Sequence, residues 1–378
     1  MNENRQQHPA GEQTVDLSVR FCGIPLTSPF VLGSGPLGNT AWGLAACYQN
    51  GAGAVTTKTI YRKPSPTVSP CMTAQGARTM LNNEGGSDLA AEAWVQEELP
   101  RAKELGATVV IANIGEYMDE DARLAQDLVA AGADIIEVGG YLEAEELVET
   151  AALVKKSVSV PVIAKVSPNW RNITAEEAAL RLLECGLDGV TAMDSVGTGM
   201  RFDLRTGRPL LGKQGHGYLS GAGILPLSLK AVYEIARRTD RDIIGLGGIT
   251  TGLDAMEMLM AGAACCGVCT YPIMYGPEAF AKLNRELAKA LADHGFQRPE
   301  QVRGRALSAG DCPPIGFDEF CYDGAKCTHC GRCISACAFH ARSERGGAVA
   351  VDENLCRRCG LCFTVCKTGA ITLKGRNL

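Results

Sequence analysis

Short apolar runs recur along the first 300 residues, and each follows a helical stretch that ends in glycine and a small residue. The arrangement occurs at 51–59, 106–114, 132–140, 186–194 and 262–270. Glycine closes the preceding helix in the left-handed conformation, and a continuous apolar run is typical of a strand buried on both faces. The pattern therefore predicts helices that alternate with buried parallel strands.

Three more apolar runs, at 30–35, 161–167 and 243–249, bring the number of predicted strands to eight. Eight such units in about 250 residues are typical of a closed (β/α)8 barrel. An open doubly wound sheet is the alternative, as is a division of this region into two smaller domains. We predict a (β/α)8 TIM barrel over 16–300, preceded by a disordered tail at 1–15.

The periodic pattern fades after the barrel. Residues 301–320, QVRGRALSAGDCPPIGFDEF, contain a Pro-Pro pair and few periodic apolar positions. Such a stretch is typical of a loop, so we expect a linker here. A separate domain is then expected at 321–378.

Two runs of cysteine near the C-terminus share the spacing C-x2-C-x2-C-x3-C. In this spacing three close thiolates hold one [4Fe–4S] cube, and the fourth cysteine of each run crosses to the other cluster. Zinc ribbons are the alternative, but their four ligands come as two separated pairs. We therefore expect two clusters, one held by Cys327, Cys330, Cys333 and Cys366, and the other by Cys356, Cys359, Cys362 and Cys337.

The segment 321–378 resembles bacterial two-cluster ferredoxins. It is an internal duplication, because the cysteine run that begins at Cys356 repeats the spacing of the run that begins at Cys327. It differs from that family at Ala338 and Lys367, where proline usually follows the fourth cysteine of each run. These differences remove no cluster ligand.

Composition restricts the function further. The 378 residues are 46% apolar and 21% charged, and the formal charge of −5 makes nucleic acid an improbable partner. The sequence has no apolar run long enough to cross a membrane, and MNENRQQHPAGEQ lacks the apolar core of a signal peptide. With eight of the 17 cysteines at cluster spacing, we expect a cytoplasmic protein whose thiols stay reduced.

The first predicted strand runs into Gly33-Ser34-Gly35-Pro36-Leu37-Gly38, which satisfies the GxGxxG pattern of dinucleotide-binding loops. No Asp or Glu occurs between Gly38 and Asn82, although a nicotinamide site needs a carboxylate about 20 residues on. We expect instead that Gly33, Ser34 and Gly35 form a flat first loop against a planar cofactor.

Barrel enzymes place their chemistry at the carboxyl ends of the strands. The seventh strand ends at Gly247-Gly248 and the eighth at Cys269-Thr270, while Ser220-Gly221 precedes a helix. Exposed backbone amides and hydroxyl groups suit a phosphate, so the three pairs together favour FMN. Lys58 and Lys165, near the ends of apolar strands, would stabilise a reduced, anionic flavin.

Residues 16–297 resemble the flavin barrel shared by dihydroorotate dehydrogenases and the pyrimidine-reducing half of dihydropyrimidine dehydrogenases. The attached ferredoxin segment makes the resemblance to the second group stronger. The matching stretches are KTI at 58–60, NNEGGS at 82–87, KVSPN at 165–169, TAMDS at 191–195, LSG at 219–221 and GGI at 247–249.

The resemblance implies roles for individual residues. It predicts that FMN is held by Lys58, Lys165, Ser220, Gly221, Gly247, Gly248 and Thr270, and we add Cys269 to this group. The residues expected to face the substrate are Asn82, Glu84, Asn169, Asp194 and Ser195.

Two departures from the family concern the substrate. After the fourth strand the family has an Asn-x-Ser-Cys-Pro-like segment and a mobile loop that carries a catalytic Cys or Ser. Here residues 137–143, EVGGYLE, continue directly into the next helix, and Gly139 replaces the substrate-binding amide. After the sixth strand Asp194-Ser195 replaces Asn-Thr, so a carboxylate that only accepts hydrogen bonds replaces an amide.

If the barrel reduces a C=C bond, a proton must reach one carbon while hydride reaches the other. The candidate donors are Tyr141, Tyr117 and His216, and Tyr141 and His216 rank level. Lys165 completes the expected catalytic set.

The sequence predicts an FMN- and iron–sulfur-dependent oxidoreductase that reduces an activated C=C in a small, nitrogen-containing ring. Because no convincing nicotinamide site is found, electrons should come from a ferredoxin or an NAD(P)H-oxidising flavoprotein subunit, within a homo- or hetero-oligomer. One alternative is a true dihydropyrimidine or dihydroorotate dehydrogenase with a substitute acid. The other is an electron-transfer subunit whose flavin only relays electrons.

Overall fold

The computed structural model describes residues 15–65, 68–116, 118–140, 142–212, 214–310 and 320–374. The chain divides into two compact units, Met1–Ala309 and Gly310–Leu378. Of the expected N-terminal tail at 1–15, only Val15 lies within the described residues, and it packs against the core of the first unit.

Eight parallel strands close into a barrel in the first unit. In chain order they are β3 (Phe30–Leu32), β4 (Ala54–Thr56), β7 (Val110–Ile114), β8 (Ile135–Val138), β9 (Val162–Val166), β10 (Gly189–Ala192), β13 (Asp242–Leu246) and β14 (Cys265–Val268). The ring closes where β14 pairs with β3, with Gly267 opposite Val31. The predicted (β/α)8 barrel is confirmed, and the open sheet is excluded.

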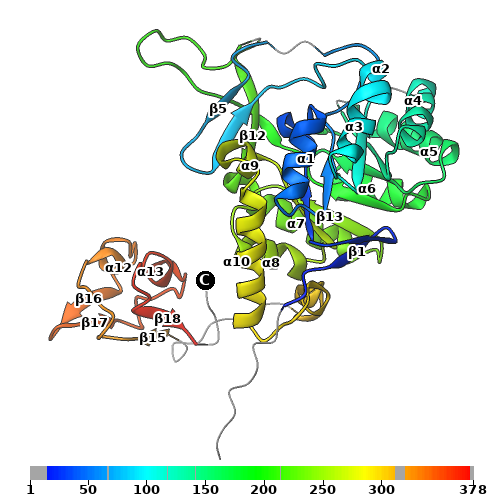
Figure 1. Ribbon diagram of the computed structural model, residues 1–378. Coiled ribbons are helices and arrows are strands. Elements are labelled where there is room, and N and C mark those ends of the chain that lie inside the picture. The colour runs from blue at the N-terminus through cyan, green and yellow to red at the C-terminus, as the bar shows by residue number, and fades with distance from the viewer. Residues whose placement is uncertain are drawn as a thin grey trace, which may run out of the picture. The chain divides into compact units, whose positions relative to one another are not determined.

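Helices cover the outside of the barrel (Figure 1). The α-helices are α1 (Ala41–Gln49), α2 (Ala91–Ala93), α3 (Leu99–Glu104), α4 (Met118–Ala130), α5 (Ala144–Ser157), α6 (Ala175–Glu184), α7 (Leu225–Ala236), α8 (Gly252–Met260), α9 (Thr270–Tyr275), α10 (Ala279–Asp293) and α11 (Arg305–Ser308). Local sequence sets their ends: a capping box between Thr174 and Glu177 starts α6, and Gly186, at φ 93°, follows its last turn.

The interior of the barrel is filled by apolar side chains from the strands. Ile111, Ile135, Ile163 and Ile244 form one buried cluster there. The N-terminal hairpin of β1 (Val19–Phe21) and β2 (Ile24–Leu26) packs against this cluster. Each fully buried side chain of this size contributes roughly 1.5–3 kcal/mol, so the interior supports a rigid site at the strand ends.

A second sheet is built from the segments that follow the second and sixth barrel strands. It contains β5 (Met72–Ala74), β6 (Thr79–Asn82), β11 (Val196–Met200) and β12 (His216–Gly221), in the order β11-β12-β6-β5. We call it the covering sheet. His216 belongs to β12, which pairs with β6 on one side and β11 on the other. Ser220-Gly221 ends this strand and precedes a helix, as predicted, because η3 (Ala222–Ile224) and then α7 follow.

The expected linker at 301–320 is not a single stretch without structure. Arg305–Ser308 form α11, Val302 is fully buried, and the Arg303 guanidinium lies 2.9 Å from the Asp242 carboxylate. These contacts attach the start of the segment to the barrel. Phe320 already belongs to β15, and residues 311–319 lie outside the described part of the chain.

The second unit shows the duplication expected from its cysteine runs. β15 (Phe320–Tyr322) pairs with β18 (Ile371–Leu373), and β16 (Arg342–Arg345) pairs with β17 (Ala348–Val351). Two short helices, α12 (Arg332–Ser335) and α13 (Leu361–Thr364), occupy equivalent positions in the two halves. Each follows a left-handed glycine, Gly331 or Gly360.

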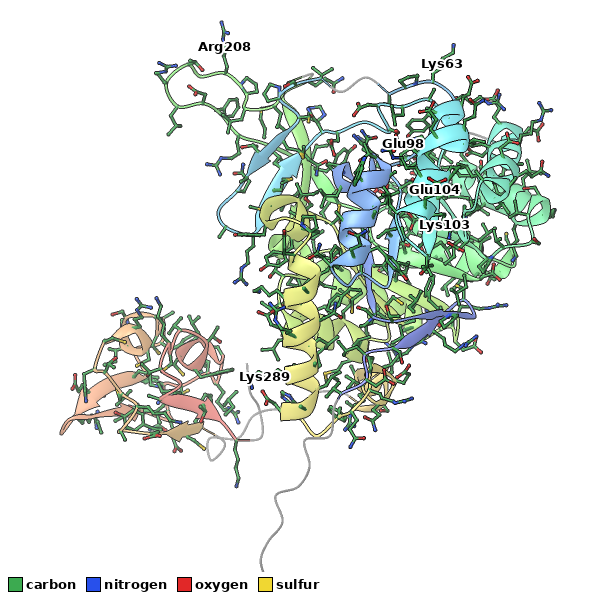
Figure 2. All side chains as sticks on the ribbon, viewed as in Figure 1. Lys63, Glu98, Lys103, Glu104, Arg208 and Lys289 are labelled. Atoms are coloured by element: carbon green, nitrogen blue, oxygen red, sulfur yellow. The ribbon has the colours of Figure 1, made fainter. Side chains whose placement is uncertain are left out.

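Charged side chains lie over the surface of the barrel unit (Figure 2). Lys289 near the end of α10 pairs with Asp293, and Arg208 belongs to the exposed segment between β11 and β12. Within the described residues, no helix combines the length and apolar character needed to cross a membrane.

Candidate functional site

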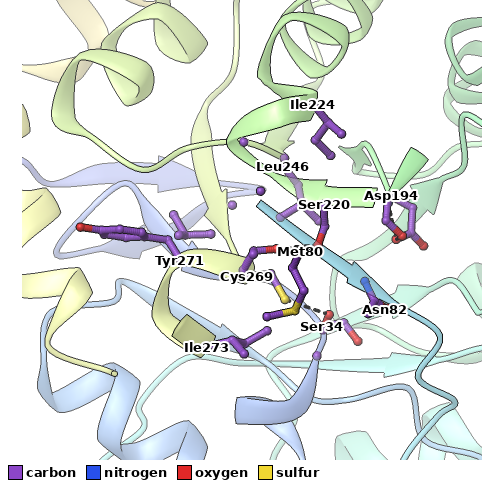
Figure 3. Close-up of a pocket in the computed structure, with 18 of the residues that line it drawn as sticks. Ser34, Met80, Asn82, Asp194, Ser220, Ile224, Leu246, Cys269, Tyr271 and Ile273 are labelled. Carbon is purple, nitrogen blue, oxygen red and sulfur yellow. Dashed lines mark hydrogen bonds between the residues drawn. The ribbon is translucent and has the colours of Figure 1, made fainter. Parts of the chain in front are cut away.

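A pocket opens at the carboxyl ends of the barrel strands, beneath the covering sheet (Figure 3). The space within it is about 710 Å³, including the part that is open to solvent. A second pocket of about 990 Å³ adjoins it, because the two share several lining residues. The shared residues are Ser34, Gly35, Asn82, Glu84, Lys165, Asp194 and Ser195.

Glycines and hydroxyl groups line one end of the first pocket. Gly247 and Gly248 follow β13 with φ angles of 120° and 91°, a conformation that favours glycine. Gly221 at the end of β12 lies at the same end, and the Thr270 hydroxyl donates to Ser220 Oγ at 2.9 Å. Backbone amides and hydroxyls of this kind can bind a phosphate.

The loop after β3 forms another wall. Ser34 and Gly35 line both pockets, and Gly33 lies against Leu246 and Cys269. A Cβ atom at Gly38 would meet the Thr56 carbonyl oxygen at 2.3 Å, so only glycine lets this loop approach β4 so closely. The GxGxxG pattern therefore serves the packing of the first loop on the barrel mouth.

Cys269 lies in this wall as a neutral thiol. Burial raises the pKa of Cys269 to about 12, although the nearby Lys165 ammonium lowers it. The Cys269 thiol donates to the Ser34 carbonyl oxygen at 3.5 Å. The residue therefore supplies polarisable apolar surface to the pocket rather than a thiolate.

Lys58 and Glu84 form a nearly buried ion pair in the second pocket. Lys58 follows β4 by two residues, is 4% exposed, and its Nζ lies 3.2 Å from Glu84 Oε1. Burial raises the pKa of Glu84 in spite of the Lys58 ammonium, which lowers it. The pair therefore places a cation and a titratable carboxyl group side by side.

Lys165 and Asp194 form the second ion pair of the site. Lys165 on β9 is 9% exposed, and its Nζ lies 3.6 Å from Asp194 Oδ2. Burial disfavours its charged form, but Asp194 and Glu137 outweigh burial and raise the pKa of Lys165. The lysine therefore remains protonated and presents a positive charge to both pockets.

Glu137 also belongs to the site, although we did not predict it from the sequence. It is buried on β8, where its carboxylate accepts hydrogen bonds from the Asn113 side-chain amide and the Thr191 hydroxyl. Asn113 Oδ1 is buried with no protein partner among the described residues. The signal was present, because a Glu in the apolar run IIEV must be buried with partners.

The link between β8 and α5 is short, as the sequence indicated. Residues 139–143 connect the two elements, and Glu143 with Glu146 forms a capping box that starts α5. A Cβ atom at Gly139 would lie 3.1 Å from the Asn113 side chain and 3.6 Å from Lys165 Cβ. The replaced amide position thus borders the buried cation directly.

The structure brings most of the predicted site residues together. Lys58, Asn169 and the shared residues Asn82, Glu84, Asp194 and Ser195 line the second pocket. His216 lines neither pocket, and its carbonyl oxygen accepts from the Asn83 side chain. Tyr141 and Tyr117 lie outside the described residues.

Several lining residues were missed. Tyr218 lies two residues beyond His216 on β12 and lines the second pocket, as does Trp170, whose indole donates to the Leu142 carbonyl at 3.1 Å. The alternation in HGYLSG could have indicated that Tyr218 and Ser220 share a face. The apolar lining of the first pocket includes Met80, Met193, Leu246 and Ile249.

These residues fit a flavin mononucleotide. The first pocket combines a hydroxyl- and amide-rich end for one phosphate with apolar walls for a planar ring, and it continues to the buried cation Lys165. When bound, FMN supplies hydride and one-electron chemistry at this position.

The eight cysteines of the two C-terminal runs line two separate cavities. Cys327, Cys330, Cys333 and Cys366 line one. Cys337, Cys356, Cys359 and Cys362 line the other. The fold thus brings the last cysteine of each run to the opposite run.

Two buried donors without partners in the described protein, Tyr322 OH and Arg342 Nε, border these cavities and suit the sulfides of a cluster. Among the described residues, no three His, Cys, Asp or Glu side chains could hold a single metal ion.

The barrel, its pocket and the two cysteine-lined cavities define a flavin- and iron–sulfur-dependent oxidoreductase. The family model described as "Dihydroorotate dehydrogenase" matches residues 16–291, and the chain belongs to this family. The model "4Fe-4S binding domain" matches residues 349–372, which decides against zinc ribbons. The cofactors are therefore FMN and [4Fe–4S] clusters.

Characterised relatives are similar over much of the chain. The catalytic subunit of dihydroorotate dehydrogenase B (NAD(+)) from Methanothermobacter thermautotrophicus is 32% identical over 305 residues, which cover 77% of this chain and 98% of the relative. The NAD-dependent dihydropyrimidine dehydrogenase subunit PreA from Escherichia coli is 31% identical over 366 residues, which cover 86% of each. The second match extends over both units.

Proposed function

We propose that this enzyme takes electrons through its two clusters to FMN and reduces an activated C=C bond in a small, nitrogen-containing ring whose polar edge donates hydrogen bonds. The observation that carries the proposal is the pair of carboxylates, Glu84 and Asp194, that line both pockets. A carboxylate only accepts hydrogen bonds, so it favours N–H donors or a cationic ring. Each carboxylate also has a lysine neighbour, Lys58 or Lys165.

The amides around these carboxylates support binding of a small polar ring. Asn82 lines both pockets from β6, and Asn169 lines the second pocket. Asn169 is held in place because its side-chain amide donates to the Ser195 carbonyl at 2.9 Å and its oxygen accepts from Gly197 N–H. A ring bound here would meet positioned polar partners, with Trp170 and Tyr218 as flat walls.

We assign the remaining roles by position in the pocket. FMN is held by Gly33, Ser34, Gly35, Lys58, Lys165, Ser220, Gly221, Gly247, Gly248, Cys269 and Thr270. Lys165 stabilises negative charge on the reduced ring. Tyr141 and His216 remain the proposed proton donors, and a substrate-bound enzyme in which His216 moves toward the ring would favour it over Tyr141.

The electron source is proposed to be a separate protein, either a ferredoxin or an NAD(P)H-oxidising flavoprotein subunit. Two relatives are named as subunits of NAD-linked enzymes, which supports a hetero-oligomer. Eight cysteines arranged around two cluster cavities also support a reducing, cytoplasmic location.

A reoxidation assay tests the proposed substrate class. The full chain, loaded with FMN and clusters, is reduced with limiting dithionite without oxygen and then mixed with single ring compounds. Aminopyrimidines and cationic rings should restore the oxidised flavin spectrum faster than the anionic orotate. Glu84→Gln should reduce this preference, and Asp293→Asn, an exposed carboxylate on α10, should leave it unchanged. Fastest reoxidation by orotate would contradict the proposal, and reoxidation only by an acceptor protein would identify a relay.

A second candidate is dihydropyrimidine dehydrogenase activity with a substitute acid. The match to the Escherichia coli subunit over 86% of both chains favours it, because that match includes the iron–sulfur unit. In the same assay this activity would appear as rapid reoxidation by uracil or thymine.

A further inference from the structure

The two halves of the iron–sulfur unit carry different residues at two pairs of equivalent positions beside the cluster cavities. When the run that begins at Cys327 is aligned with the run that begins at Cys356, Arg342 corresponds to Ile371 and Tyr322 corresponds to Val351. The strand pairing follows the same relationship: Tyr322 faces Ile371 between β15 and β18, while Val351 faces Arg342 between β17 and β16. The first cavity is therefore bordered by Tyr322 and Ile371. The second cavity is bordered by Arg342, whose strand partner is Val351.

Arg342 lies directly against the second cavity. It is 7% exposed, and its Nη2 donates to Cys362 Sγ at 3.3 Å. Its guanidinium carbon lies 5.6 Å from the centre of the Phe320 ring, which holds the group in place. Its Nε is buried and has no partner in the described protein. A buried guanidinium with one donor on a cysteine sulfur and one left over needs a further acceptor at the cavity.

The first cavity has an apolar residue where the second has this charge. Ile371 lines it and is almost fully buried, so the position of the guanidinium is occupied by an apolar side chain. The Tyr322 hydroxyl at the same cavity is a neutral donor. The other arginines that line the cavities, Arg332 at the first and Arg357 and Arg358 at the second, are exposed to water, which screens their charge. Hydrogen bonds from a charged donor are roughly twice as strong as neutral ones, so the buried Arg342 makes the two cavities unequal in their stabilisation of negative charge.

We propose that Arg342 raises the reduction potential of the cluster held by Cys337, Cys356, Cys359 and Cys362 above that of its neighbour, so that an electron shared between the clusters resides on this one. Each cluster gains one electron on reduction, with no bond made or broken, and its net charge becomes more negative by one. The guanidinium stabilises that added charge through its proximity and its N–H···S bond. Net charge and hydrogen bonds to the sulfurs are among the determinants of cluster potential.

The charge of Arg342 also reaches the other cluster, but more weakly. The interaction between charges weakens with distance, so the guanidinium acts less on the cluster that it does not border. The hydrogen bond described above goes to Cys362, and Arg342 lines the second cavity rather than the first. A change at Arg342 should therefore affect both clusters in the same direction and the second cluster more.

The test is an EPR-monitored redox titration of the full chain with both clusters loaded. The wild type should show two separate one-electron steps. Arg342→Ile, which copies the partner half, should bring the two steps together by lowering the higher one. We expect the equilibrium constant for sharing an electron to change at least tenfold, which corresponds to about 59 mV for one electron. Arg342→Lys, which keeps the charge, should lie between the two.

Control variants separate this effect from a general change in surface charge or loss of a cluster. Arg345→Gln removes an exposed cation from the same strand and should leave both steps in place. If Arg342→Ile fails to hold its second cluster, Cys330→Ala still shows which cluster has the higher step, because it removes the first cluster and should leave the higher step, and Arg342→Lys then tests the contribution of the guanidinium. Equal shifts of both steps in Arg342→Ile, or survival of the lower step in Cys330→Ala, would overturn the proposal.

Discussion

The Lys165 ammonium and the Asp194 carboxylate lie 3.6 Å apart at the mouth of the barrel, and both side chains line the first pocket, where we place the flavin, and the second pocket beside it. The ammonium is kept charged by Asp194 and by Glu137 behind it. The pair therefore couples the electrostatics of the cofactor to those of the substrate. A change in either residue should alter both flavin potential and ring preference.

Lys165→Ala should weaken FMN binding and lower the flavin potential, because it removes the buried cation beside the reduced ring. A contribution of about 1 to 3 kcal/mol corresponds to a rise in Kd of about 5- to 150-fold. Fluorescence titration of the flavin-free protein and a dye-coupled redox titration measure the two effects. Lys289→Ala, an exposed lysine paired with Asp293, is the control. Full flavin occupancy at an unchanged potential would mean that Lys165 has no role in the flavin site.

Asp194→Asn should shift substrate preference toward rings with an acceptor edge, because an amide both donates and accepts. Each buried polar group that gains or loses its partner changes the free energy by about 1–3 kcal/mol. The ratio of kcat/KM for uracil to that for an aminopyrimidine should therefore rise by one to two orders of magnitude, and the flavin potential should rise as Lys165 loses an anionic neighbour. Asp293→Asn should change neither value.

The chain should contain about eight irons and eight acid-labile sulfides, from two clusters of four. Because Cys366 borders the cavity of the first run, Cys366→Ser and Cys330→Ser should diminish the same EPR signal, whereas Cys337→Ser should diminish the other. Each variant should retain about four irons. If Cys366→Ser instead depleted the same cluster as Cys356→Ser, the crossed ligation would be wrong.

Asp121 should make the barrel less stable as the pH rises. Burial raises the pKa of Asp121 to about 6, although its Oδ1 accepts from Glu116 N–H at 3.1 Å. The folded state thus keeps a proton on Asp121 that the unfolded chain releases near pH 4. The contribution of Asp121 to the free energy of unfolding is therefore most favourable below about pH 4 and is lost as the pH rises through about 6.

Asp121→Asn tests this dependence by removing the ionisable group while keeping the acceptor for Glu116. It should stabilise the protein at pH 7.5 by up to about 3 kcal/mol and by much less at pH 5. Thermal unfolding followed by circular dichroism at both pH values measures the difference. Asp119→Asn, an exposed acid in the same first turn of α4, should show no such trend. A gain for Asp121→Asn that is the same at both pH values would contradict the assignment.

Turnover of uracil, thymine or orotate should be slow even when the flavin accepts electrons readily. Residues 139–143 leave no room for the family's mobile loop between β8 and α5, so no Cys or Ser is positioned there as an acid. Protonation by water instead of a positioned acid costs a factor of about 10² to 10⁴. Steady-state assays with a chemical electron donor measure the rate. A kcat of about 1 s⁻¹ or more would show that another residue has replaced the acid.

The barrel could be predicted because its strands are buried on both faces and therefore appear as continuous apolar runs. The cysteine grouping could also be anticipated, because spacing alone limits which thiolates can share a cube. Lys58 and Lys165 were recognisable for a related reason: a buried charge in or just after an apolar strand needs a partner. The same reasoning applied to Glu137 would have predicted its network with Asn113 and Thr191.

The covering sheet was harder to predict. β5, β6, β11 and β12 are short, and their pairing joins segments that lie far apart in the sequence, which local patterns do not encode. His216 and Tyr218 are two residues apart on β12 and share a face, so alternation alone did not show that Tyr218 lines the pocket while His216 does not. Likewise, α11 depends on burial of Val302 against the barrel rather than on its own periodicity.

The covering sheet carries residues that face the substrate ring, whereas most of the proposed flavin-binding residues lie on the barrel. Most residues that we assign to the flavin lie on the barrel strand ends and the first loop, whereas Asn82 and Tyr218 belong to the covering sheet and Asp194 leads into it. Mutations in β6, in β11 and in the first part of β12, before Ser220, can therefore alter which ring is accepted without loss of the cofactor. Enzymes for different heterocycles can therefore arise from one flavin barrel through changes in the covering sheet.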